Sequence, residues 1–326
     1  ESRLILSIAD NNQSTLEQAI SHYSATLHPK IYERLALDIP NGNEGKDGTI
    51  VLPNAIPLDT RVLILCAGEG ERWGEYLGKP KQLAPIFGVP LLVRTAGQVQ
   101  HYFGVSPVIV THDPRLHIPG CDSFCPEQRR WVVETFLSTA CLWSSRTVVL
   151  LGNVLYTDAA IPICRAASGG LVIFGRQGAS IFTGKRYGEL FGLSFTRDYS
   201  DFVTHCLIQV IGDATRGGRG KLWEFYFLAQ REPPSGRPPI EFCEIHDYTE
   251  DFDSPEEYHY LKRLCEWALS SAPALRLLAI LWSSVFCAPY ASWHRWKQWW
   301  HDRRNTRRTT LPLSRPQTSP SHRAAA

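Results

Sequence analysis

The sequence predicts an α/β protein with a single, mostly parallel sheet flanked by helices. Short apolar runs of strand length alternate with longer segments whose apolar residues recur at helical spacing. Strands that alternate with helices in this way form a largely parallel sheet. The chain has 326 residues, which is enough for one large domain of this kind with additional segments. In such sheets, ligands bind beyond the carboxyl ends of the strands.

The expected elements follow one another from residue 61 onwards. A last helix begins at Ser254-Pro255-Glu256-Glu257, because the serine can cap it, the proline suits its first turn and the acids complement its dipole. The expected strands are 62–65, 107–111, 147–151, 171–174, 189–195 and 241–245, and the expected helices are 90–101, 126–145, 202–211 and one from 254.

Composition divides the chain into three parts. Residues 1–60 form an N-terminal extension, residues 61–270 form the α/β domain, and residues 271–326 form a C-terminal helix and a basic tail. The tail is rich in Arg, Ser, Thr and Pro, so we expect it to be disordered. Tryptophans at 293–300 follow an uncharged run, which suits a membrane interface. That run is shorter than the roughly 20 residues needed to span a bilayer, and a helix packed on the domain is favoured over membrane contact.

Charge and cysteine usage exclude several classes of protein. A net charge of +2 gives no general case for nucleic-acid binding, so no specific nucleic-acid partner is expected. The nine cysteines include no C-x-x-C pair, which argues against a zinc ribbon or a redox motif. Free thiols and the lack of a signal peptide at the start favour a cytoplasmic protein. The oligomeric state is left open.

One glycine-rich loop is the most informative feature of the sequence. It follows the expected strand 62–65 and contains Gly68, Gly70 and Arg72, with Lys81 a short distance beyond. Glycines allow a sharp turn and a close approach of the backbone to a ligand, and successive N–H groups in such a turn bind anions. The arginine and the lysine supply charge for phosphate groups. We therefore predict a clamp for a nucleoside triphosphate.

The clamp resembles a known superfamily. L-x-A-G-x-G-x-R followed by P-K is similar to the signature of nucleotidyltransferases with a glycosyltransferase-A-type fold, which include sugar-phosphate nucleotidylyltransferases and have molybdenum-cofactor guanylyltransferases as relatives. The resemblance implies a Rossmann-like nucleotidyltransferase fold. It also implies Mg²⁺-dependent transfer of a nucleotidyl group to a phosphorylated small molecule, such as a sugar phosphate, with release of pyrophosphate. The matching residues are Leu65, Ala67, Gly68, Gly70, Arg72, Pro80 and Lys81.

The resemblance assigns roles to individual residues. It makes Arg72 and Lys81 catalytic, through contacts with the phosphates. Nucleotide binding is implied for Ala67, Gly68, Gly70, Lys79 and Gly152. A dinucleotide-binding fold competes with this interpretation, because Gly68-x-Gly70 also follows a strand. That motif requires a third glycine where Trp73 stands, and an acid about 20 residues on, where residues 90–95 offer none.

The expected Mg²⁺ ligands come from two further places. In the family an apolar strand ends in Gly-Asp, but here the strand 147–151 is followed by Gly152 and Asn153. Asn offers a neutral oxygen but no charge, and Mg²⁺ prefers carboxylates, phosphates and water. Asp253, in a D-S-P element before the last helix, matches a second family position, and Asp251 would face the same side of an extended segment. Asp158 is a possible substitute for the missing Asp.

Two other functions stay open at this point. The chain could be a catalytically weakened nucleotide-binding or regulatory protein, because Asn153 replaces the expected Asp. It could also be a glycosyltransferase that holds a nucleotide-sugar through a metal at Asp251-x-Asp253. In the nucleotidyltransferase interpretation, Arg176, Lys185 and Arg186 are candidates for holding the phosphate of the acceptor.

Overall fold

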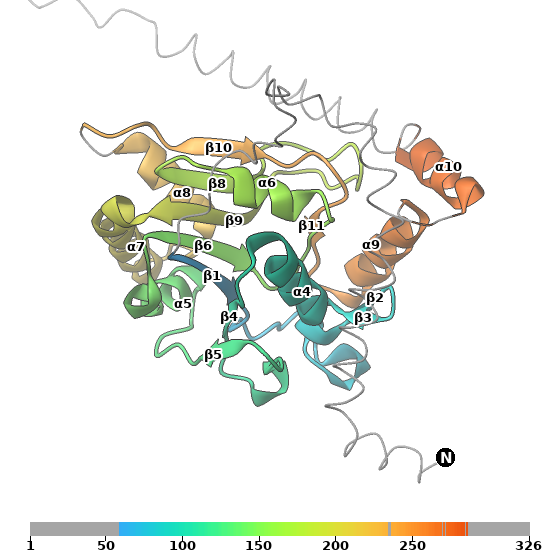
Figure 1. Ribbon diagram of the computed structural model, residues 1–326, viewed down its shortest axis with the longest axis horizontal. Helices are drawn as coiled ribbons and strands as arrows, with labels where there is room; N and C mark the ends of the chain where they lie inside the picture. The colour runs from blue at the N-terminus through green and yellow to red at the C-terminus, as the bar shows by residue number, and fades with distance from the viewer. Residues whose placement is uncertain (1–58, 234–235, 269, 271, 284, 286–326) are drawn as a thin grey trace, which may run out of the picture.

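The computed structural model describes residues 59–233, 236–268, 270, 272–283 and 285 (Figure 1). The expectations for the N-terminal extension up to residue 58, for the tryptophans at 293–300 and for the basic tail lie outside the described residues.

The described residues form a seven-stranded sheet in the order β10-β8-β9-β6-β1-β4-β5. Only β9 runs antiparallel to its neighbours, and the other strands of this sheet are parallel. The predicted α/β class with a mostly parallel sheet is therefore confirmed. The strands are β1 Thr60–Leu65, β4 Val108–Val110, β5 Asp122–Phe124, β6 Arg146–Leu151, β8 Leu171–Arg176, β9 Glu189–Thr196 and β10 Glu241–Glu244.

Helices cover both faces of the sheet, which is why the central strands are apolar without alternation. In β1, Val62 and Ile64 face one layer, and Leu63 and Leu65 face the other. The first layer contains α4 (Leu91–Phe103) and α6 (Ala160–Ala166), and the second contains α5 (Val132–Ser138), α7 (Ser200–Thr215) and α8 (Leu222–Arg231) (Figure 1).

A third, smaller apolar cluster lies under α9 (Pro255–Ala268) and positions the site. Trp73, Leu155, Phe252 and Tyr258 are buried together in it. It joins α9 to two small antiparallel sheets, formed by β2 (Pro85–Ile86) with β3 (Val89–Pro90), and by β7 (Val154–Leu155) with β11 (Glu250–Asp251). Figure 1 shows α9 together with β2, β3 and β11 at one end of the main sheet.

The structure corrects one expected element and adds others. The helix expected over 126–145 is wrong, because α5 ends at Ser138. The Thr139 hydroxyl then donates to the Phe136 carbonyl oxygen at 2.6 Å, and such local bonds compete with helix continuation. The elements that the sequence pattern did not predict are β5, α6, α8 and the two small sheets, whereas α10 (Pro273–Trp282) lies in the region where a C-terminal helix was expected.

Gly152 holds the ends of two central strands together. Its N–H donates to the Leu65 carbonyl oxygen at 2.9 Å, at the point where β1 and β6 both end. A Cβ atom on this residue would lie 2.2 Å from Cys66 Sγ and 2.9 Å from the Leu65 carbonyl oxygen. No side chain fits there without a shift of the backbone.

We predict that Gly152→Ala destabilises the fold by about 1–3 kcal/mol, because the added methyl group overpacks this strand junction. Urea unfolding measures the effect. The matched control is Gly97→Ala in α4, where a Cβ atom would meet nothing within 4 Å, and which we expect to be stabilising by up to about 1 kcal/mol. Equal midpoints for Gly152→Ala and the parent would contradict the prediction.

Candidate functional site

The clamp loop leaves β1 and closes on itself in a tight turn. The Trp73 N–H donates to the Gly70 carbonyl oxygen at 2.8 Å, and the Gly74 N–H donates to the same oxygen at 3.3 Å. Gly70 and Gly74 have φ angles of 64° and 58°, in the left-handed region that favours glycine. Among the described residues, no partner accepts a hydrogen bond from the backbone N–H groups of residues 68–72. These groups are available to an anion.

Trp73 anchors this loop to the domain. Its ring is buried against Tyr76, Phe252 and Tyr258. Its indole N–H donates to the Lys79 carbonyl oxygen at 2.7 Å, which fixes the segment that leads to Lys81. The sequence pattern did not predict that Trp73 anchors the clamp loop.

The carboxylate of Asp253 is the common partner of the predicted site residues. Lys81 Nζ donates to Asp253 Oδ1 at 2.5 Å, and Asn153 Nδ2 lies 3.3 Å from the same oxygen. Arg72 forms an ion pair with Asp253 Oδ2. Residues from the clamp, from the end of β6 and from the start of α9 therefore meet at one group.

Backbone pairing brings Asp253 to this place. In the β7–β11 pair, Asp251 is opposite Val154, and the Phe252 N–H lies 3.4 Å from the Asn153 carbonyl oxygen. Glu257 accepts a hydrogen bond from the Asp253 N–H at 2.8 Å. The start of α9 thus fixes the backbone of Asp253, and the predicted capping by Ser254 is present, since its hydroxyl accepts from the Glu257 N–H at 3.3 Å.

The charges of this cluster are paired with one another. Burial raises the pKa of Asp253, but Lys81 and Arg72 lower it by more, so the pKa lies below its usual value. The carboxylate is therefore ionised at neutral pH, and it neutralises part of the charge that two cations offer.

A second cluster of charges lies beside the first. Lys185 Nζ is 3.3 Å from Asp251 Oδ1 and 3.2 Å from Glu257 Oε1. Burial lowers the pKa of Lys185, but the surrounding carboxylates raise it by more. Burial raises the pKa of Asp251. Burial, and then the neighbouring Asp251 and Glu250, raise the pKa of Glu189.

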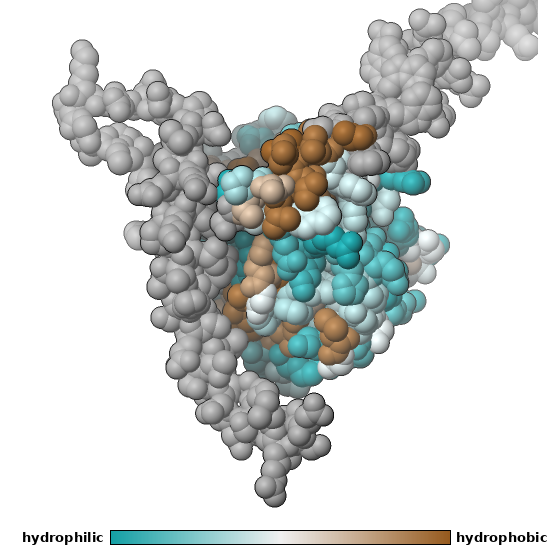
Figure 2. Space-filling view, turned by 90° about the vertical axis from the view of Figure 1, so that its right-hand side faces the viewer, coloured by the Kyte–Doolittle hydropathy of each residue, from teal (hydrophilic) through white to brown (hydrophobic). Residues whose placement is uncertain are grey.

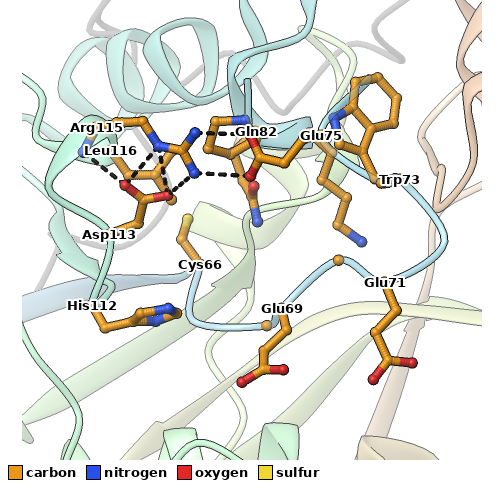
Figure 3. A pocket seen from close by; sticks show the side chains of 15 residues that line it. Cys66, Glu69, Glu71, Trp73, Glu75, Gln82, His112, Asp113, Arg115 and Leu116 are labelled. Atoms are coloured by element: carbon orange, nitrogen blue, oxygen red, sulfur yellow. Dashed lines mark hydrogen bonds and ion pairs between the residues drawn. The ribbon is translucent and has the colours of Figure 1, made fainter. Parts of the chain in front are cut away.

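A cavity of about 330 Å³ opens next to Lys81. Figure 3 shows its walls: Arg115 bridges Asp113 and Glu75, while Glu69 and Glu71 point away from this network. The Arg115 guanidinium lies 2.8 Å from Glu75 and 2.7 Å from Asp113, which ties the clamp loop to the loop after β4. The other lining residues include Cys66, Gly68, Gly70, Trp73, Pro80, Gln82, His112 and Leu116.

The predicted site residues fall into two groups. The structure brings Arg72, Lys81, Asn153 and Asp253 together, with Asp251 in the adjoining cluster, whereas Gly68, Gly70 and Lys81 line the cavity. The predicted residues Ala67, Lys79 and Gly152 are not among the residues that line the cavity. Their predicted contacts with a nucleotide stay predictions.

Two further candidates do not fit their expected roles. Arg176 is buried in an ion pair with Glu250 at 3.0 Å, so it is not presented to an acceptor. Asp158 accepts from Arg94 at 3.0 Å and from Gln98 at 2.7 Å, so it is held by α4 and does not substitute for Asn153.

Gln82, His112 and Arg115 line the cavity but were not among the residues predicted from the sequence. Gln82 directly follows Lys81, and His112 and Arg115 follow β4, which ends at the same edge of the sheet as β1. The rule that ligands bind beyond the carboxyl ends of parallel strands was the signal that could have found the latter two.

No cluster of three or more His, Cys, Asp or Glu side chains with metal-binding geometry occurs among the described residues. In the same part of the chain, no helix is long and apolar enough to cross a membrane.

Comparisons with known proteins gave likenesses of fold only. No family model and no curated protein matches the chain. One similar structure is a CTP:phosphocholine cytidylyltransferase from Streptococcus pneumoniae, at 11% identity and a TM-score of 0.47 over 63% of this chain and 98% of that chain. Another is a glucose-1-phosphate thymidylyltransferase, described as putative, from Bacillus anthracis, at 12% identity and a TM-score of 0.44 over 63% and 94%.

A third similar structure is a CMP:2-keto-3-deoxy-manno-octonic acid synthetase complexed with CTP, at 12% identity and a TM-score of 0.43, covering 63% of this chain and 97% of that chain. At such identities and TM-scores no argument about function rests on these likenesses.

We predict that Trp73→Phe lowers the free energy of unfolding by about 1 kcal/mol, because the Lys79 carbonyl oxygen loses its donor. Trp73→Ala should cost about 3–5 kcal/mol, because the ring also leaves a cavity. Urea unfolding measures both. The control is Trp223→Phe, whose ring stacks on Phe227 and Phe242 in α8 and β10. A Trp73→Phe variant as stable as the parent would show that the indole hydrogen bond does not hold the loop.

Proposed function

We propose that this chain binds a nucleoside triphosphate at the clamp and transfers its nucleotidyl group to a phosphorylated small molecule, with release of pyrophosphate. The observation that carries the proposal is the Asp253 carboxylate shared by Arg72, Lys81 and Asn153. A glycine-rich turn that merely lies on the surface would not bring Arg72 and Lys81 together with the end of β6 at the Asp253 carboxylate, before α9.

Lys81 joins two parts of the proposed site. Its ammonium group contacts Asp253, and the residue also lines the 330 Å³ cavity. A triphosphate on the unpaired N–H groups of the glycine loop would place its phosphates at Arg72 and Lys81. The cavity beside them, walled by Gln82 and His112, is then the space for the nucleoside.

Charge balance supports a divalent cation in this site. A triphosphate must replace Asp253 as the partner of Arg72 and Lys81. The freed carboxylate would then face phosphate oxygens of the same sign, which is costly without a positive charge between them. Asp253, Asp251 and Asn153 carry the hard oxygen atoms that Mg²⁺ prefers, so these residues would hold the ion. When bound, it would neutralise charge on the phosphates.

This reaction requires little covalent chemistry from the protein itself. An oxygen of the acceptor phosphate forms a bond to the α-phosphorus, and the bond between the α-phosphorus and the bridging oxygen to the β-phosphate breaks. Pyrophosphate leaves with that electron pair. Catalysis of such transfers depends on positioning and charge stabilisation. Arg72 and Lys81 supply the charge, and the N–H groups of the loop orient the phosphates. Lys185 remains a candidate for the acceptor phosphate, because it lies beside Asp251.

The first test measures nucleotide binding by calorimetry, with and without Mg²⁺. We predict that Lys81→Gln loses a charge-assisted contact worth about 1.5–3 kcal/mol of binding free energy. The matched control is Lys262→Gln, which removes a lysine paired with Glu266 on the surface of α9. If both variants bind every nucleoside triphosphate as the parent does, Lys81 is not part of a phosphate clamp.

The same titrations test Asp253 separately. We predict that Asp253→Asn weakens the Mg²⁺ dependence of nucleotide binding and improves metal-free binding, because the variant no longer competes with the phosphates for Arg72 and Lys81. Asp213→Asn, which removes an exposed carboxylate on α7, is the control. A parent and an Asp253→Asn variant with the same dependence on Mg²⁺ would contradict the assignment.

Asn153 decides between an active and a weakened enzyme. We predict that Asn153→Asp raises the rate of pyrophosphate release with a panel of sugar phosphates, because it adds a carboxylate beside Asp253. A fully active parent that Asp slows would show that Asn153 is not a degraded ligand. If both proteins bind nucleotide and neither releases pyrophosphate, the chain is a binding or regulatory protein. Release of sugar from a nucleotide-sugar instead would favour the glycosyltransferase alternative.

A further inference from the structure

Helix α10 is attached to the domain by its polar and small residues. Arg276 donates to the Ser270 carbonyl oxygen at 2.5 Å, and the Ser283 hydroxyl donates to the Phe182 carbonyl oxygen at 3.2 Å. Ala279, between them on the same face, is fully buried. Residues at 276, 279 and 283 follow helical spacing, so they form one stripe that faces the domain.

Trp282 contacts Tyr260 of α9, but the aliphatic side chains of α10, and Val285 just beyond its end, are exposed. Leu277, Ile280 and Val285 are 56–58% exposed, and Leu278 and Leu281 are each 49% exposed. Figure 2 shows an apolar patch at this corner of the molecule, next to hydrophilic surface. A helix in water normally buries its apolar face and exposes its polar one. Helix α10 instead leaves most of its aliphatic residues exposed, and no described residue buries them.

Contiguous exposed apolar surface of this kind marks a contact with another molecule or with a membrane. The sequence that follows α10 indicates which. Residues 286–326 carry eight Lys and Arg residues against one Asp, and they include Trp293, Trp296, Trp299 and Trp300. Tryptophans and basic residues next to an apolar helix suit the interface of an anionic bilayer.

A second copy of the chain fits these observations less well. A symmetric contact through α10 would bring two copies of a strongly basic segment to the same region, where like charges repel. An anionic surface satisfies both features, since apolar side chains enter the lipid and basic residues meet the headgroups. The helix has ten residues, which is too short to span a bilayer, so it would lie along the surface.

We propose that α10, with the outward face formed by Leu277, Leu278, Ile280, Leu281 and Val285, docks the protein on an anionic lipid surface. This inference is independent of the proposed function, because none of these residues belongs to the clamp. The sequence alone favours a helix packed on the domain. The helix does pack there, but it leaves most of its aliphatic residues exposed.

The experiment is co-sedimentation of the full chain with sucrose-loaded vesicles. One set contains phosphatidylcholine alone, and the other contains phosphatidylcholine with phosphatidylserine. We expect binding to the anionic set that weakens as salt is raised. The triple variant L277Q/I280Q/L281Q should reduce the partition coefficient by about tenfold or more, because three apolar side chains no longer enter the lipid.

The matched control is I208Q/F227Q, which removes two equally exposed apolar side chains on α7 and α8. It should bind vesicles as the parent does, and circular dichroism with urea unfolding establishes that both variants are folded. Three results would overturn the proposal. These are no binding to either vesicle set, binding that the α10 variant leaves unchanged, and light scattering that shows a dimer dissociated by the α10 substitutions without any vesicle binding.

Discussion

The ion pairs of Asp253 with Arg72 and Lys81 are the interaction on which the site depends. They connect the glycine loop after β1 to the start of α9, two segments far apart in the sequence. With Asn153 donating to the same carboxylate, the contact also includes the end of β6. The side chains of Lys81 and Asp253 are largely buried, and a buried charge is costly without a partner, so these two groups constrain each other's position, whereas Arg72 is 67% exposed.

This arrangement pairs the charges of the site with one another. The carboxylate neutralises cations that we propose for a triphosphate, so the ligand must displace an internal partner before it can bind. In the proposed function, ligand binding and metal binding would be coupled, because the displaced carboxylate would need a new positive charge. The coupling explains in physical terms why nucleotide without a divalent cation should be a poor ligand of the parent and a better one of Asp253→Asn.

The apolar cluster under α9 gives the charged cluster its rigidity. Trp73 packs on Phe252 and Tyr258, so the clamp loop and the segment before Asp253 rest on the same core. Positioning residues of this kind act through the groups that they hold. Helix α10 contacts α9 at the same end of the domain (Figure 1), and its aliphatic side chains are exposed. The proposed nucleotide site and the proposed lipid-binding face therefore use different surfaces of neighbouring elements.

The sequence by itself determined the α/β class, most strands and the clamp, because apolar runs and glycines at fixed spacing act locally. It also identified Arg72, Lys81, Asn153 and Asp253, through the resemblance of their motifs. Only the tertiary structure decided which of these residues meet, since the pairing of β7 with β11 joins positions a hundred residues apart. Arg176 is buried in an ion pair with Glu250, so it is not presented to an acceptor, and Asp158 is paired with Arg94 of α4. The orientation of α10 was likewise not readable from its composition, because apolar residues occur around much of its circumference and the contacts of Arg276 and Ser283 set its rotation.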